Sequence, residues 1–157
     1  MKRVMIIACV VFSIVAAMLV IEIHVREETD DGFSCIASYI QHSKGFRINM
    51  MVSYTFGARN GIINLTGIAT DETGKIWSLD RRVIFQYYRE ENIYFLTSVR
   101  TTRFPNDNAD TMMLNRYIPS FYLKDSQEIV LKILPNGSNN YLFFLDPIPM
   151  YNCKLAL

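Results

Sequence analysis

The sequence is poor in cysteine, in glycine and proline, and in net charge, and each shortage excludes a class of protein. Three cysteines among 157 residues are too few for a disulfide-dense miniprotein. Seven glycines and five prolines exclude a collagen-like or low-complexity chain. A formal net charge of +1 offers no basic footprint for nucleic acid. What remains is a globular chain, 50% hydrophobic, with the length of one domain.

The sequence also lacks catalytic and metal-binding motifs. Its two histidines, His24 and His42, cannot form a multi-histidine metal site within one chain. The HExxH, CxxC, P-loop, GxSxG and GxGxxG patterns do not occur. Neighbouring acids such as Asp107 and Asp110 fall in predicted turns or at a predicted helix start, which favours solvated turns and caps over an acid/base pair. We therefore expect a protein that is not an enzyme, with no catalytic residue, metal or cofactor.

A long apolar run stands at the N-terminus. Residues 4–21 are eighteen consecutive uncharged residues, which as a helix would cover roughly 27 Å of the ~30 Å bilayer core. Lys2 and Arg3 precede the run and acidic residues follow it, so the positive-inside rule places Met1 in the cytoplasm and the rest outside. A signal peptide cleaved after the small residues Ala16 and Ala17 is the alternative. The predicted organisation is a cytoplasmic tip and transmembrane anchor over 1–23, an acidic linker over 24–32 and an exported β domain over 33–157.

Two of the three cysteines lie in the predicted exported domain. Cys35 follows the linker and Cys153 is close to the C-terminus, whereas Cys9 lies within the apolar run and is interpreted as a membrane thiol. Two thiols in an oxidising compartment favour one disulfide between Cys35 and Cys153. Two unrelated buried thiols are the alternative.

Alternation of apolar and polar residues predicts most of the strands. Residues 46–56 alternate over eleven positions, and shorter runs at 62–70, 77–87 and 93–99 follow as a meander. Asn60-Gly61 predicts the first hairpin turn. In the last two runs the apolar face is assigned to odd positions, including Trp77, Phe85 and Phe95.

The pattern changes after the meander. Residues 109–118 have helical spacing after potential N-caps and end at Pro119, which predicts one short helix. Strands resume at 129–133 and 141–145, and a last extended piece carries Cys153. The fold class is therefore mainly β: a transmembrane helix followed by an antiparallel β-meander that forms a barrel or half-barrel with one inserted helix. An incomplete barrel would leave an open edge where another chain can add a strand.

Two features of the predicted strands are candidates for binding. Arg81 shares the apolar face of its strand, where it could bind an anion, pair with an internal acid or extend to the barrel rim. Strand aromatics could line a pocket for a lipid or bile salt, or could be plain core. The candidate pocket residues are Trp77, Phe85, Tyr87, Phe95 and Phe143.

Scattered features over nearly the whole chain resemble one bacterial family. They are the N-terminal anchor, Phe33-Ser34-Cys35, Gly61 and Gly67 flanking a strand, Arg82-Val83-Ile84-Phe85, Pro105 and Asp107 before the short helix, Pro119-Ser120-Phe121, and Cys153. This layout resembles the FidL-like membrane proteins, which are small inner-membrane proteins encoded beside transmembrane winged-helix regulators of the ToxR type.

The resemblance implies an accessory role at the inner membrane. The periplasmic domain would bind a ToxR-like transmembrane regulator and stabilise or modulate it, and two anchored proteins meet at high effective concentration. A more distant analogy to ToxS-type proteins implies a joint barrel that admits a hydrophobic ligand such as a bile salt. The alternative is a stand-alone, lipocalin-like periplasmic binder of a lipid or bile salt. An envelope hydrolase would need a converging nucleophile and base that the sequence does not offer.

Overall fold

The computed structural model describes residues 12–16, 18, 32–43, 45–145 and 147–156. The chain divides into two compact units, Met1–Asp31 and Gly32–Leu157. In the first unit, residues 12–16 and 18 are helical and exposed. The predicted anchor over 1–23 and linker over 24–32 lie mostly outside the described residues. Within the described part of the chain, no helix has the length and apolar character needed to cross a bilayer.

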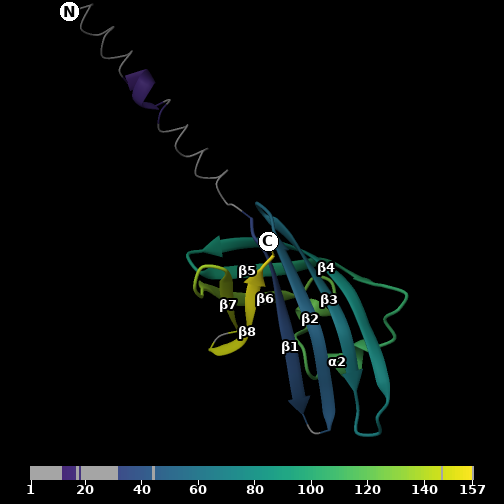
Figure 1. Cartoon of the computed structure of the whole chain (residues 1–157). Helices are drawn as coiled ribbons and strands as arrows, with labels where there is room; N and C mark the ends of the chain where they lie inside the picture. Colours follow the sequence, from purple (N-terminus) through teal and green to yellow (C-terminus); the bar gives the residue numbers. More distant parts are fainter. Residues whose placement is uncertain (1–11, 17, 19–31, 44, 146, 157) are drawn as a thin grey trace, which may run out of the picture. The chain divides into compact units, whose positions relative to one another are not determined.

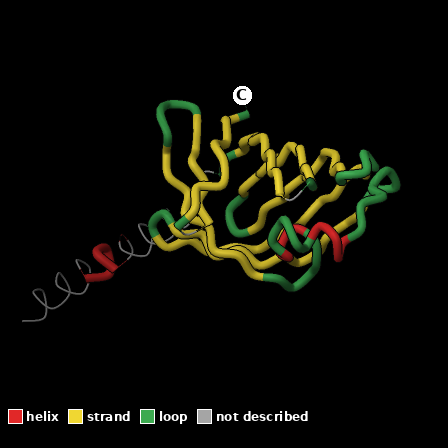
Figure 2. Tube along the Cα trace, turned by 90° about the horizontal axis from the view of Figure 1, so that it is seen from below, coloured by secondary structure: helices red, strands yellow, loops and turns green. Residues whose placement is uncertain are grey.

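The second unit is a closed antiparallel barrel in which eight strands pair in chain order (Figure 1). The strands are β1 (Ser34–Ser43), β2 (Phe46–Phe56), β3 (Asn60–Thr70), β4 (Ile76–Glu90), β5 (Ile93–Arg103), β6 (Glu128–Pro135), β7 (Asn140–Leu145) and β8 (Ile148–Leu155). Between β5 and β6 lie α2 (Thr111–Leu114) and the 3-10 helix η1 (Ser120–Tyr122). Figure 2 shows the strands curving round, with these helical turns gathered at one place. The predicted mainly-β antiparallel fold is confirmed, and of the two alternatives the barrel is closed.

Period-two alternation determines which residues enter the core. In β2 every even position from Phe46 to Phe56 is buried and the odd positions face outward. The same rule holds in β3, where Ile63 and Leu65 are fully buried, and in β4, where Leu79 and Val83 are buried. Because successive side chains of a strand point to opposite faces, the inward sets of neighbouring strands pack into one core.

The first hairpin turn differs from its prediction. The bend lies at residues 57–59, while Asn60 and Gly61 already belong to β3 and Gly61 pairs with Phe56. Glycine is required here for a packing reason, because a Cβ at Gly61 would lie 2.1 Å from the Phe85 ring. The predicted hairpin is confirmed, but its bend lies just before the Asn60-Gly61 dipeptide, where Gly61 allows the close approach of an aromatic ring.

The face of β5 is also opposite to the predicted one. The turn at Glu91 and Asn92 places Arg89 opposite Tyr94 and Tyr87 opposite Leu96, so even positions of β5 share a face with odd positions of β4. Directly opposed residues in an antiparallel pair lie on the same face. Tyr94 and Leu96 are therefore buried, and Phe95 stacks on Tyr88 on the outer face, with ring centroids 4.6 Å apart.

Two further elements were misjudged or missed by sequence. The predicted helix over 109–118 is shorter, since α2 covers only Thr111–Leu114 and is capped by Asp110, whose carboxylate accepts from the Met113 N–H. Pro119 precedes η1 rather than ending α2. The strand β1 has no predicted counterpart, because isoleucines at 36 and 40 on its outer face hide the alternation of Cys35 and Ala37 on the inner face.

Candidate functional site

The barrel closes through a short join between its first and last strands. Among the described residues, β1 pairs with β8 at two positions, Cys35 with Leu155 and Ile36 with Lys154. By contrast, β1 pairs with β2 at ten positions along its whole length. Figure 1 shows β8 meeting β1 beside the C-terminus and then diverging from it. We call the region where they separate, between residues 37–43 of β1 and 148–151 of β8, the seam.

The sequence of β7 and β8 explains the divergence. The register of β7 and β8 shifts between Phe143 and Phe144, so that Tyr151 lies opposite Phe143 and Pro149 lies opposite Phe144. Such a bulge bends the strand that carries it. Pro149 has no N–H to donate to a neighbouring strand. This half of β8 is therefore poorly suited to continue the ladder along β1.

Two contiguous pockets occupy the seam. The first, of about 710 Å³, is lined by Ile36, Ser38, Ile40, Met150, Tyr151, Asn152, Lys154 and Leu155. The second, of about 540 Å³, is lined by Tyr39, Ile40, Gln41, Asn115, Arg116, Tyr117, Ile118, Pro119, Leu145, Ile148, Pro149 and Met150. Ile40 and Met150 line both, so the two pockets adjoin, and we refer to them together as the groove. At its rim, Ile40 is 61% exposed and Ile148 is 67% exposed, which is unusual for large apolar side chains.

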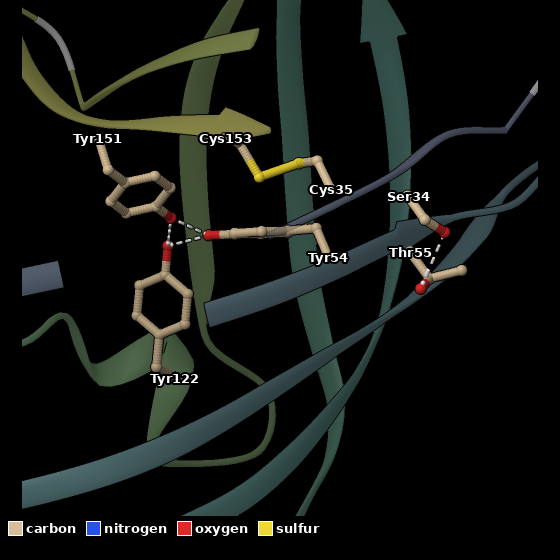
Figure 3. Close-up of a disulfide and its surroundings, with 7 residues drawn as sticks. All are labelled: Ser34, Cys35, Tyr54, Thr55, Tyr122, Tyr151 and Cys153. Atoms are coloured by element: carbon tan, nitrogen blue, oxygen red, sulfur yellow. Dashed lines mark hydrogen bonds between the residues drawn. A yellow bond between two sulfur atoms is a disulfide. The ribbon is translucent and has the colours of Figure 1, made fainter. Parts of the chain in front are cut away.

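A disulfide fixes the joined end of the two strands. Cys35 and Cys153 are bonded and fully buried, with their Cα atoms 5.4 Å apart (Figure 3). The predicted pairing is confirmed. Because the bridge joins residues 118 positions apart at the short join, it holds the barrel closed where the β ladder is weakest.

Three buried tyrosines meet beside the disulfide. Tyr54 comes from β2, Tyr122 from η1 and Tyr151 from β8, and their hydroxyls converge (Figure 3). Tyr54 Oη lies 2.7 Å from Tyr122 Oη and also bonds Tyr151 Oη, while Tyr122 and Tyr151 are 3.3 Å apart. This tyrosine cluster ties the inserted helical turns and β8 to the interior of β2.

Burial keeps the tyrosine cluster protonated. Removal from water raises the pKa of Tyr54, Tyr122 and Tyr151 above the ordinary phenol value of 10.0. The three hydroxyls therefore remain neutral donors and acceptors through the physiological pH range. Tyr151 is also one of the residues that line the first pocket, so the strand that carries this member of the cluster borders the groove.

The inserted segment after α2 forms the other wall. Residues 115–119 line the second pocket opposite β8. The Tyr117 ring stacks on Phe46 at 4.3 Å. The hydroxyl of Tyr39 donates to Gln41 Oε1 at 2.6 Å and lies 3.5 Å from the Tyr117 carbonyl oxygen. These contacts attach the segment to the ends of β1 and β2 and so determine the shape of the groove.

The charges around the groove are of one sign. Its described lining residues include Arg116 and Lys154 and no acid. Arg116 and Lys154 are both exposed, and neither has an ion-pair partner in the described part of the chain. The groove therefore combines a mostly apolar lining with one cation in each pocket.

Arg81 lies on the inner face, as expected, but away from the seam. It is 1% exposed and its guanidinium makes four hydrogen bonds: to both carboxylate oxygens of Asp107 at 2.7 and 3.3 Å, to the Ala109 carbonyl at 2.9 Å and to the Thr111 hydroxyl at 3.1 Å. Of the alternatives left open by sequence, pairing with an internal acid is the arrangement observed. Arg81 thus fastens the segment before α2 onto β4.

Asp107 is the acid that sequence analysis misplaced. Its side chain is fully buried and also accepts from Arg103 Nε at 3.0 Å and from the N–H groups of Asp80 and Ala109 at 3.0 and 3.1 Å. Burial alone would raise the pKa of this carboxyl, but the hydrogen bonds from Arg81 and Asp80 and the charges of both arginines outweigh it and lower the pKa below 3.8. Asp107 is therefore an ionised, buried anchor, whereas Asp110 is the predicted helix cap.

The five candidate pocket residues do not line one pocket, since four belong to the core or pack against it and Phe95 does not. Phe85, Tyr87 and Phe143 are buried in the core, with Phe85 and Tyr87 rings 5.9 Å apart and Phe143 packed on Tyr54 instead. Trp77 is partly buried near Phe46, and Phe95 lies on the outer face. None of the five lines either of the two pockets described here.

The sequence signals for the groove were weak but present. Exposed Ile36 and Ile40 break the alternation of β1, and Pro147 and Pro149 bracket the start of β8. Residues 39–41 and 115–119 meet only through the tertiary fold. No cluster of histidine, cysteine, aspartate or glutamate suited to a metal ion occurs within the described ranges.

The geometry defines a class of protein. The chain forms an eight-stranded antiparallel barrel that is bridged by a disulfide and has a mostly apolar groove where the first and last strands diverge. Residues 32–153 match the YqeJ C-terminal domain family, and the chain belongs to that family. The search among curated proteins and the search among solved structures returned no match. The match does not test the FidL-like resemblance, which stays a prediction.

Proposed function

We propose that this protein is a non-enzymatic accessory protein of the bacterial inner membrane. Its β domain lies in the periplasm, binds a ToxR-like transmembrane transcriptional regulator and stabilises or modulates it. The FidL-like resemblance supports the location and the partner, and the apolar run over 4–21 supports an anchor with its N-terminus in the cytoplasm. The buried disulfide is in keeping with an oxidising compartment.

The observation that carries a binding role is the groove along the seam. A monomeric barrel normally pairs the whole of its edge strands, because an unpaired edge attracts other chains. Here most of β1 has no partner on that side among the described residues, and large apolar side chains lie at the rim. Removal of such an apolar surface from water by a bound partner lowers the free energy and so favours binding.

Co-purification from solubilised membranes tests the proposal. The full-length chain is expected to bring down one single-span protein with a DNA-binding domain, and removal of residues 1–32 is expected to weaken the recovery because the partners lose their common membrane. A substitution on the outer face of β3, Ile68→Ala, is the matched control and should leave recovery unchanged. Recovery of the full-length chain alone, or of a chain trimmed near Ala17, would count against the accessory role.

A second function is favoured by the size of the pockets. Volumes of about 540 and 710 Å³ with mostly apolar lining fall in the range of small-molecule sites. A lipid or bile salt could place its apolar body against Ile40 and Met150 and its anionic group near Arg116. Titration of the full chain with a bile salt, followed by Trp77 fluorescence and repeated with Arg116→Gln, distinguishes this alternative, which requires saturable binding weakened by the substitution.

A further inference from the structure

We infer that the groove takes an extended, acid-bearing segment of the partner protein, which pairs as an added strand with the free edge of β1. This inference rests on the proposed function and specifies how the partner is recognised.

The backbone of β1 shows which groups are available. The Ser34 carbonyl accepts from the Ala156 N–H on the β8 side, whereas the Phe33 carbonyl accepts from the Phe56 N–H on the β2 side. Peptide groups of alternate residues in a strand point to the same side. The N–H and C=O of Ser38 and Ile40 therefore point into the seam, beyond the last β1–β8 pair at Ile36.

These groups have no backbone partner among the described residues, because the ladder to β8 has already ended and the ladder to β2 uses the odd positions. Residues 37–43 carry no proline and no lysine, the residues that commonly blunt an exposed edge. The facing edge of β8 carries Pro149. An incoming strand is therefore expected to pair with β1 and to pack against β8 through side chains.

The outer side chains indicate the composition of that strand. Ile40 and Ile148 are exposed on either side of the seam, and Met150 lies between the two pockets. A strand that covers them needs apolar residues at alternate positions. Its hydrogen bonds to the backbone supply affinity, and these contacts supply selectivity.

The charges select among occupants. Arg116 and Lys154 are the charged described residues of the groove, so carboxylates on the incoming segment would complete two ion pairs. A second copy of this chain that paired its own β1 edge here would bring its own Arg116 and Lys154 to the same groove. Like-charge contacts of this kind are unfavourable, which argues for a different, acid-bearing protein.

Site-specific photocrosslinking of the full-length chain in its native membranes tests the inference. A photoreactive residue replaces Ile40, and the control replaces Ile68, which is exposed two strands away in the same row of the sheet. The expected result is an adduct from position 40 and none from position 68. The crosslinked peptide of the partner should contain aspartate or glutamate.

Backbone and charge variants decide the mechanism. Ser38→Pro removes an N–H that points into the seam and spares the β1–β2 ladder, while Ser38→Ala keeps that N–H. The proline is expected to lower the yield of the adduct about tenfold and the alanine to leave it unchanged. Arg116→Glu combined with Lys154→Glu should lower the yield of the adduct by a similar factor. If the proline variant fails to form the Cys35–Cys153 bridge, this charge-reversal variant alone tests whether the groove binds the partner segment.

Three outcomes would overturn the inference. They are an adduct with a second copy of this chain, no adduct from position 40, or an adduct whose yield is unaffected by both the proline and the charge reversal. In each case, co-purification of a regulator remains a separate test of the proposed accessory function. Recovery of the regulator together with any of these outcomes would leave the accessory role in place and refute strand addition.

Discussion

Removal of the Cys35–Cys153 bridge is the perturbation with the largest expected effect on this barrel. The bridge closes a loop between residues 118 positions apart and lies beside the two residue pairs that join β1 to β8. Without it, closure of the barrel depends on that short ladder and on the tyrosine cluster. The variant Cys35→Ala with Cys153→Ala removes the bridge without leaving an unpaired thiol in the core.

The magnitude follows from chain entropy. For a closed loop of this length, the loop-entropy relation gives about 5 kcal/mol of stabilisation at 25 °C, and native bridges in small exported domains commonly contribute about 2–5 kcal/mol. Total unfolding free energies of domains are about 5–15 kcal/mol, so the loss is a large share of the stability. We expect the double variant to lose about 3–5 kcal/mol.

Urea unfolding followed by tryptophan fluorescence measures this loss, because Trp77 is the single tryptophan and is partly buried in the barrel. Cys9→Ser is the matched control, since it removes a thiol outside the described residues and leaves the bridge intact. A loss below about 1 kcal/mol in the double variant would refute the reasoning, because closure would then not depend on the bridge.

Three further predictions concern the interior. Asp107→Asn should cost about 3–5 kcal/mol of unfolding free energy in urea titrations, because it leaves the Arg81 guanidinium buried without its counter-charge. The control Asp110→Asn, at an exposed helix cap, should cost at most about 1 kcal/mol. Because the pKa of Asp107 is lowered in the folded state, its contribution to the free energy of unfolding is present above pH 3.8 and is lost as the pH falls through the pKa of the folded state. Thermal unfolding midpoints measured below pH 3.8 should therefore fall more steeply with decreasing pH in the wild type than in Asp107→Asn. Gly61→Ala should cost about 1–3 kcal/mol by forcing a Cβ against the Phe85 ring, and Phe85→Leu in the same chain should recover part of it; an additive double variant would contradict the contact.

Much of the fold could be predicted from local sequence because alternation is strong where one face is apolar and the other polar. β2 was predicted at its observed bounds, and the inner faces of β3, β4 and β6 were assigned correctly. Where both faces carry apolar residues, alternation is ambiguous. Ile93, Tyr94, Phe95 and Leu96 fit either face, and only the register of the turn at Glu91 decides that Tyr94 and Leu96 enter the core.

The candidate site was less predictable, since its parts come from distant segments. Arg81 on an apolar face indicated an internal partner, but nothing in the spacing identified Asp107, which reaches Arg81 only when the segment before α2 folds back onto β4. The groove needs β1, β8 and residues 115–119 together. No local sequence pattern indicates that the pairing of β8 with β1 ends after two residue pairs.

The sequence by itself indicated most of the antiparallel strands and their order as a meander, because period-two patterning is local. It also favoured the pairing of Cys35 with Cys153, because few cysteines compete for it. The tertiary structure alone decided that the barrel closes, that β1 and β8 pair at only two positions among the described residues, and which side chains face the seam. The physical reason is that closure depends on the summed twist and bulges of eight strands, and small local shifts such as that at Phe143 accumulate around the barrel.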